Sequence, residues 1–270
     1  MKRLIKATAL LCLMSFFILP AMAQKYAYEN FTDSLSKKVG EAEVSIKMDV
    51  DYPASSTGDN FAAKAIRNWL QEFIKVDPDL NLPAYTGDIR DGEALISHYM
   101  NAYMTTSTAD PESIGLGLSY TLIAKYVYET SKYISYRVDL YNYMGGAHGM
   151  PYTGFAIFRK SDGHILTWRD ILKPGSSTIL RRQLARGVMR YLEAPTWAQA
   201  KESLFLSAPH NTLSTFPMPA SAPGLTAKGL KAVYQSYEIG PYLIGRPEVT
   251  IPRTLFPQLL KPAVAAAMRK

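Results

Sequence analysis

The chain has 270 residues, one cysteine, and 30 lysines and arginines against 23 aspartates and glutamates. No run of basic residues of the kind that follows a phosphate backbone occurs, so the composition argues against a nucleic-acid-binding protein. A single cysteine cannot form a disulfide within the chain, so the fold must be stabilised by a packed core, for which the length suffices.

The first 23 residues predict a secretory signal peptide. Lys2, Arg3 and Lys6 precede an apolar run at residues 7–19, and the small-residue motif Ala21-Met22-Ala23 follows. The run is shorter than the ~20 residues that a membrane-spanning helix needs, and no later segment reaches that length. We therefore expect cleavage after Ala23 and a mature protein in the periplasm or outside the cell, without a transmembrane anchor.

The N-terminal half of the mature chain predicts a hairpin and two helices. Residues 26–52 alternate between apolar and polar side chains around Gly40, which is typical of a β-hairpin. Asp59 is suited to cap a helix that ends before Asp77, and a second helix spans about residues 91–103. We expect residues 24–112 to form a smaller N-terminal α+β lobe.

The C-terminal half predicts more strands, with helices between them. Strands are expected near 116–129, 132–143, 151–159 and 164–168, a helix near 177–192, a short helix near 198–206, strands near 225–235 and 248–251, and two closing helices near 255–260 and 263–268. This order, without regular strand–helix–strand crossovers, predicts an α+β fold with a mostly antiparallel sheet. We expect residues 113–270 to form a larger lobe, with all its strands in one antiparallel sheet that the 177–192 helix covers on one face.

Three glycines surround a histidine in Gly145-Gly146-Ala147-His148-Gly149. Glycines permit positive φ angles and close backbone approach, so this turn is able to present amide groups and an imidazole to a ligand. The alternative is a tight turn between strands in which His148 satisfies buried carbonyl groups. A Walker-type phosphate loop is excluded, because no lysine with a following serine or threonine succeeds the glycines.

A second motif, Tyr237-Glu238-Ile239-Gly240-Pro241-Tyr242, combines two aromatic rings and a carboxylate with a Gly-Pro turn. Such a segment suits stacking on a sugar or rigid docking of a protein partner. The alternative is a structural turn in which Glu238 pairs with a nearby arginine or histidine.

With Thr153-Gly154, residues 161–170 and Gly245, the two motifs resemble a domain of unknown function. That family includes the extracellular region of the anti-sigma factor RsiV, a lysozyme receptor, and the non-catalytic N-terminal domain of peptidoglycan deacetylase C. The resemblance covers roughly residues 44–260. It implies an RsiV-like α+β domain in which the two motifs meet, with His148 near Glu238. The ligand-binding residues that it implies are Gly145, Gly146, His148, Tyr237, Glu238 and Tyr242.

The resemblance favours a non-catalytic, exported cell-envelope binding protein whose partner is a lysozyme-like envelope protein or a cell-wall glycan. The deacetylase carries its chemistry on a separate domain, which has no counterpart in these 270 residues. A glycan-modifying hydrolase is the alternative. It stays open because the carboxylates of Asp139, Asp162, Asp170 and Glu238 are suited to glycoside chemistry if two of them meet.

Metal and cofactor chemistry are not expected. The histidines His98, His148, His164 and His210 are dispersed without metal-binding spacing, and no serine lies in a nucleophile elbow. One further pattern is a stripe of arginines at 182, 186 and 190, four residues apart. It predicts either a site for an anionic ligand or an ordinary solvated helix face.

Overall fold

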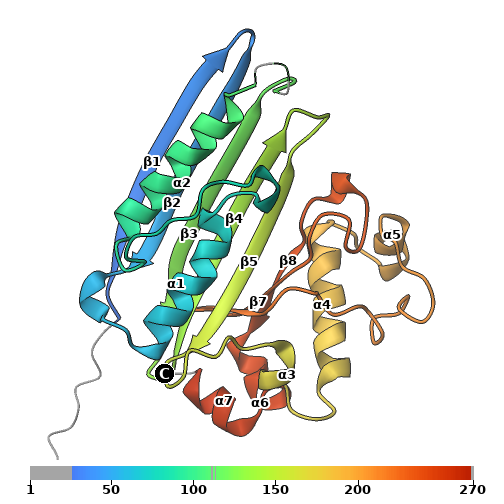
Figure 1. Ribbon diagram of the computed structural model, residues 1–270. Helices are drawn as coiled ribbons and strands as arrows, with labels where there is room; N and C mark the ends of the chain where they lie inside the picture. Colours follow the sequence, from blue (N-terminus) through green and yellow to red (C-terminus); the bar gives the residue numbers. More distant parts are fainter. Residues whose placement is uncertain (1–25, 111, 113, 269–270) are drawn as a thin grey trace, which may run out of the picture.

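The structure is a computed structural model that describes residues 26–110, 112 and 114–268. It contains a long five-stranded sheet covered by two helices, and a short three-stranded sheet beside a third long helix (Figure 1). This is the predicted α+β class. The predicted signal peptide, residues 1–23, lies outside the described residues. Within the described part of the chain, no helix is long and apolar enough to cross a membrane.

The long sheet follows the order of the sequence. Its strands are β1 (Tyr28–Val39), β2 (Ala42–Pro53), β3 (Leu118–Glu129), β4 (Tyr133–Met144) and β5 (Met150–Arg159). Neighbouring strands are antiparallel except β2 and β3, which are parallel. Parallel neighbours require a long crossover connection, and residues 54–117 provide it. The predicted boundary at residue 112 falls in this crossover, so strands from both predicted lobes share one sheet.

The crossover carries α1 (Phe61–Ile74) and α2 (Gly92–Ser107), which cover one face of the long sheet (Figure 1). The Asn60 side chain accepts a hydrogen bond from the Ala63 amide at 2.8 Å, so the cap of α1 lies one residue after the predicted Asp59. Asp91 caps α2 in the same way. Alternate side chains of β2 are fully buried against these helices, and together they form the first hydrophobic cluster.

The prediction of a single sheet is wrong. Strands β6 (Gly224–Thr226), β7 (Gly229–Val233) and β8 (Glu248–Pro252) form a separate antiparallel sheet, and α4 (Ser177–Tyr191) packs on β8. A turn between Thr226 and Gly229 splits the predicted 225–235 strand into a hairpin. Phe155 and Ile157 project from β5 away from α1, and Gly224 packs directly on the Phe155 ring. The small sheet therefore covers the opposite face of the long sheet.

Short helices complete the second hydrophobic cluster: α3 (Trp168–Ile171), α5 (Trp197–Glu202), α6 (Phe256–Leu259) and α7 (Pro262–Ala267). The strand predicted at 164–168 is reduced to one bridge between Ile165 and Phe158. Thr167 and Asp170 form a capping box there, which starts a helical turn and ends the extended backbone.

Candidate functional site

The glycine-rich segment forms the turn between β4 and β5. Gly145 has a φ of +76°, and a Cβ atom at this position would lie 2.8 Å from the Ile114 carbonyl oxygen. A Cβ on Gly146 would meet nothing within 4 Å. Gly149 is buried under the ring of Tyr141, which occupies the space of a Cβ. The turn thus requires glycine at 145, whereas a side chain at 149 would only displace the partly exposed ring of Tyr141.

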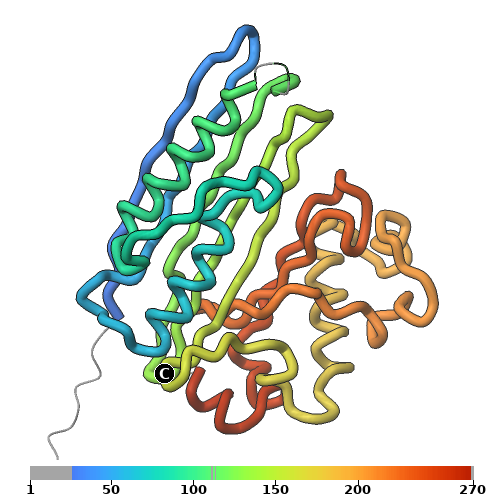
Figure 2. The backbone as a smooth tube through the Cα atoms, viewed as in Figure 1, coloured from blue at the N-terminus to red at the C-terminus, as the bar shows by residue number. Residues whose placement is uncertain are grey.

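The two sequence motifs meet at this turn, as predicted. The His148 ring stacks on Tyr242, with ring centroids 4.1 Å apart and planes inclined by 22°. The Tyr242 hydroxyl donates to the Gly149 carbonyl at 3.0 Å, and the Tyr237 hydroxyl lies 3.4 Å from His148 Nε2. Tyr141, His148, Tyr237 and Tyr242 are called the His148 cluster below. Figure 2 shows the connection from β7 to β8 running up beside β5 towards this turn.

The His148 cluster lies at the surface. Tyr237 is 50% exposed and His148 is also exposed, although its Nδ1 lies 3.1 Å from the Gly149 carbonyl oxygen. Adjacent positions add apolar side chains, with Leu243 93% exposed and Met144 and Met150 about half exposed. Exposed apolar side chains that gather in one place indicate an interaction surface.

Glu238 is hydrogen-bonded to backbone amides and not to His148. Its carboxylate accepts hydrogen bonds from the amides of Gln235 at 2.7 Å and Ala220 at 2.8 Å. These two bonds close the turn before Tyr237 and tie it to the loop at residue 220. Glu238 therefore holds the turn that carries Tyr237. Its expected partner His148 stacks on Tyr242 instead.

Replacing Glu238 by alanine is expected to lower the free energy of unfolding by about 1–3 kcal/mol, because two backbone amides lose a charged acceptor. Chemical denaturation measures this change. Glu238→Gln is the matched control, since its side-chain oxygen still accepts one of the two bonds and about half of the loss should be recovered. Equal stability of Glu238→Ala and the unmodified protein would contradict the positioning role.

A polar network joins the two sheets below the cluster. The Arg137 guanidinium donates to Asp139 at 2.5 Å and to Glu248 of β8 at 2.7 Å. Asp139 also accepts a hydrogen bond from the Thr153 hydroxyl at 2.7 Å, and Arg246 donates to that hydroxyl at 2.6 Å. The network links β4 and β5 of the long sheet with the β7–β8 part of the small one.

Opposing effects act on the carboxyl groups of this network. Burial by itself would raise the pKa of Asp139, but hydrogen bonds from Arg137 and Thr153 outweigh it, so the pKa lies below its usual value. Burial would also raise the pKa of Glu248. Hydrogen bonds from Lys231 and Arg137 outweigh it, so this pKa too lies below its usual value. Both groups are therefore ionised at neutral pH.

The Gln235 side chain makes a second link between the sheets. Its amide nitrogen donates to the Thr153 carbonyl at 2.7 Å, and its amide oxygen accepts from the Thr153 amide at 3.2 Å. Both bonds lie on the free edge of β5, because β5 is the last strand of the sheet. Sequence reasoning missed Gln235 and the network, since their partners are far apart in the chain.

The other carboxylates considered for glycoside chemistry are engaged elsewhere. Hydrogen bonds from Arg159 lower the pKa of Asp162 to about 2. The Thr167 amide of the capping box lowers that of Asp170 to about 2. A glycosidase general acid needs a raised pKa, so the lowered values at Asp139, Asp162 and Asp170 run against that role.

The remaining histidines are scattered over the molecule. His98 Nε2 lies 2.8 Å from the Pro83 carbonyl oxygen, His164 Nε2 lies 3.1 Å from Asp170, and His210 Nδ1 lies 3.1 Å from the Thr215 carbonyl oxygen. Among the residues that the structure describes, no group of three or more His, Cys, Asp or Glu side chains is placed to hold a metal ion.

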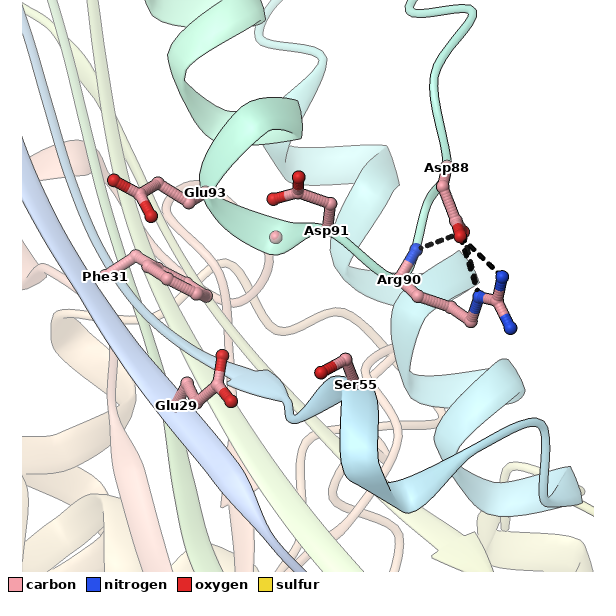
Figure 3. Close-up of a pocket in the computed structure, with 8 residues that line it drawn as sticks. Glu29, Phe31, Ser55, Asp88, Arg90, Asp91 and Glu93 are labelled. Carbon is pink, nitrogen blue, oxygen red and sulfur yellow. Dashed lines mark hydrogen bonds and ion pairs between the residues drawn. The ribbon is translucent and has the colours of Figure 1, made fainter.

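An acidic pocket of about 390 Å³ lies at the start of α2 and was not predicted (Figure 3). Glu29 and Glu93 flank the Phe31 ring there, while Asp88 forms a 2.6 Å ion pair with Arg90. Hydrogen bonds from Arg90 lower the pKa of Asp88 to about 2. Asp91 is used as the helix cap, so two of the pocket's carboxylates already serve local structure.

The predicted arginine stripe lies on α4. Arg182, Arg186 and Arg190 are all exposed, and α4 contains no acidic residue. The stripe is distinct from the His148 cluster in sequence and does not contribute to its ring contacts.

Residues 169–254 match the model of a family described as "Protein of unknown function (DUF3298)". The chain is similar to a crystal structure of a DUF3298 family protein from Pseudomonas aeruginosa PAO1, with a TM-score of 0.61, 20% identity, and coverage of 90% of this chain and 97% of that one. A DUF3298 family structure from Bacteroides fragilis NCTC 9343 gives a TM-score of 0.62, 19% identity, and coverage of 90% and 98%. The TM-scores and the coverage show a shared fold. No curated protein matches the chain.

Proposed function

We propose that this chain, in which residues 169–254 match the model of the DUF3298 family, is an exported, non-catalytic envelope protein that binds a protein partner through the His148 cluster. The observation that carries the proposal is the exposure of the cluster and its apolar margin, with Tyr237 50% and Leu243 93% exposed. Aromatic side chains ringed by other apolar groups are typical of the centre of a protein–protein interface.

The resemblance of the two motifs to RsiV, a lysozyme receptor, supports a lysozyme-like protein as the first partner to test. A cell-wall glycan is the second candidate ligand, because exposed tyrosine rings also stack on sugars. The two differ in what they require. A protein interface uses the aliphatic margin at Leu243 as well as the rings, whereas sugar stacking depends on the rings at Tyr237 and Tyr242.

The substitution Leu243→Asp separates these candidates. With a side chain 93% exposed, the change should leave the melting temperature unchanged, while a charge inside a protein interface should weaken binding at least tenfold. Binding of purified lysozyme, and capture from envelope extract with and without muramidase digestion, provide the measurements. Phe61→Asp is the matched control, because Phe61 is 65% exposed and lies at the start of α1.

Tyr237→Gly tests the rings. Tyr237 has a φ of +67°, which glycine adopts without strain, so relief of strain offsets the lost contact with Tyr242. We expect stability within about 1 kcal/mol of the unmodified protein and loss of binding to either class of ligand. Unchanged binding by both Leu243→Asp and Tyr237→Gly would exclude the His148 cluster as the binding surface.

A further inference from the structure

A cleft of about 440 Å³ lies beyond the last turn of α1, on the helix-covered face of the long sheet. Most of its wall is apolar or aromatic: Phe73, Val76, Tyr120, Leu140, Met150, Pro151 and Tyr152. The rings of Phe73 and Tyr152 stack on each other in this wall, with centroids 5.9 Å apart. The volume falls within the range of small-molecule sites, about 300–1,000 Å³.

Two polar atoms of the lining residues have no hydrogen-bond partner among the described residues. They are Asn142 Oδ1 and Ser236 Oγ, and both are shielded from solvent. The Asn142 amide nitrogen donates to Asp77 Oδ2 at 3.3 Å. A carboxylate accepts hydrogen bonds and does not donate them, so this contact fixes which end of the amide is the oxygen. Asn142 therefore offers a free acceptor, and Ser236 offers a hydroxyl.

The chain is strained on both sides of this cleft. Val76, in the wall, has a φ of +65°, which is a rare conformation for a β-branched residue. Tyr237, directly after Ser236, has a φ of +67°. Strained backbone and unpaired buried polar atoms each cost free energy, and strained residues cluster at ligand-binding and active sites.

The charges around the cleft indicate which ligands it accepts. Glu72 is part of the lining, Asp77 holds Asn142, and the described lining residues include no lysine, arginine or histidine. An anionic ligand would meet two carboxylates and no cation. The free acceptor at Asn142 needs a donor, and the aromatic walls need an apolar body.

We propose that this cleft binds a small, neutral, aromatic molecule with an N–H group, of which indole is the simplest example. Its ring packs against the stacked pair of Phe73 and Tyr152, and its N–H donates to Asn142 Oδ1. The terminal torsion of an asparagine side chain is broad, so rotation of the amide, which gives up the long 3.3 Å contact with Asp77, brings the shielded oxygen to the cleft surface. The proposal goes beyond the proposed function, because it concerns a different ligand class and a different set of side chains.

Indole and 1-methylindole test the proposal on the full mature chain. They share an apolar bicyclic ring, but only indole has an N–H. Titration calorimetry should show indole binding about tenfold more tightly, the effect of one hydrogen bond to a buried acceptor. The Asn142 side-chain amide signals should shift in the ¹⁵N NMR spectrum on addition of indole. No binding by either probe, or equal binding by both, overturns the proposal.

Two variants locate the site. Asn142→Leu removes the acceptor, so the about tenfold preference for indole over 1-methylindole should disappear and the two probes should bind equally. Asn101→Leu makes the same change on α2, where the amide donates to the Ser97 carbonyl at 2.8 Å, and should keep the preference. If Asn142→Leu does not fold, Ser236→Leu fills the cleft from the other side and should abolish binding of both probes. Unchanged indole binding in Ser236→Leu refutes the location.

Discussion

The Gly145→Ala variant is expected to lose about 2–4 kcal/mol of unfolding free energy. A non-glycine residue at a φ of +76° costs about 1–2 kcal/mol, and the new Cβ would also lie 2.8 Å from the Ile114 carbonyl oxygen. That oxygen belongs to the backbone and cannot rotate away. Chemical denaturation followed by circular dichroism measures the loss.

Gly146→Ala is the control for this prediction. The change is chemically identical and one residue away, but a Cβ at 146 would meet nothing within 4 Å. Its unfolding free energy should stay within about 0.5 kcal/mol of the unmodified protein. If both alanine variants lose the same stability, or neither does, then the contact between Gly145 and Ile114 does not determine the conformation of the turn.

The second large effect is expected at Asp139. Removing this carboxylate in Asp139→Ala leaves Arg137 with Glu248 alone and deprives the Thr153 hydroxyl of its acceptor. Breaking a fully buried ion pair costs about 3–5 kcal/mol, and because Arg137 is one third exposed we expect about 2 kcal/mol. Asp162→Ala removes a comparable but exposed pair with Arg159 and should leave stability nearly unchanged.

The same network predicts how stability depends on pH. The pKa of Asp139 is lower in the folded protein than its unfolded value of about 3.9, so the ionised carboxylate stabilises the fold above that pH. This contribution is lost as the pH falls through the folded-state pKa. Denaturation curves from pH 6 to pH 2 should decline below about pH 4, and the decline should be shallower in Asp139→Asn. Identical profiles would show that Asp139 does not contribute.

The sequence predicted the elements well and their assembly in part. Alternation along β2 identified a strand with one buried face, and the apolar period of α1 identified that helix within one residue at its start. The parallel pairing of β2 with β3 was missed, because nothing local to either strand records which neighbour lies across a 64-residue crossover. The separate small sheet was missed for a similar reason, since the strand pattern at 225–235 does not reveal the turn before Gly229.

The candidate site was likewise predicted only in part. The family resemblance implied that the 145–149 and 237–242 segments meet, and the stacking of His148 on Tyr242 confirms their contact. The role of Glu238 was not predictable, because its partners are backbone amides, which every residue except proline carries. Nothing in the sequence indicated a role for Asn142 or Ser236, because whether a polar atom lacks a hydrogen-bond partner depends on the residues that surround it in the folded protein.

The contact of Gln235 with Thr153 has a consequence for how molecules of this protein meet one another. An unpaired strand at the end of a sheet exposes amide and carbonyl groups to which a strand of a second molecule can add, and chains that do so aggregate. A carboxamide has the same donor and acceptor as a peptide unit. The Gln235 side chain therefore pairs with the amide and the carbonyl of Thr153, as a residue of a neighbouring strand would. Pro151, two positions earlier, has no N–H to offer. Gln235 thereby covers the β5 edge at Thr153, while residues 164–166 cover it further along, where the Leu166 amide donates to the Ile157 carbonyl and the Arg159 amide donates to the His164 carbonyl.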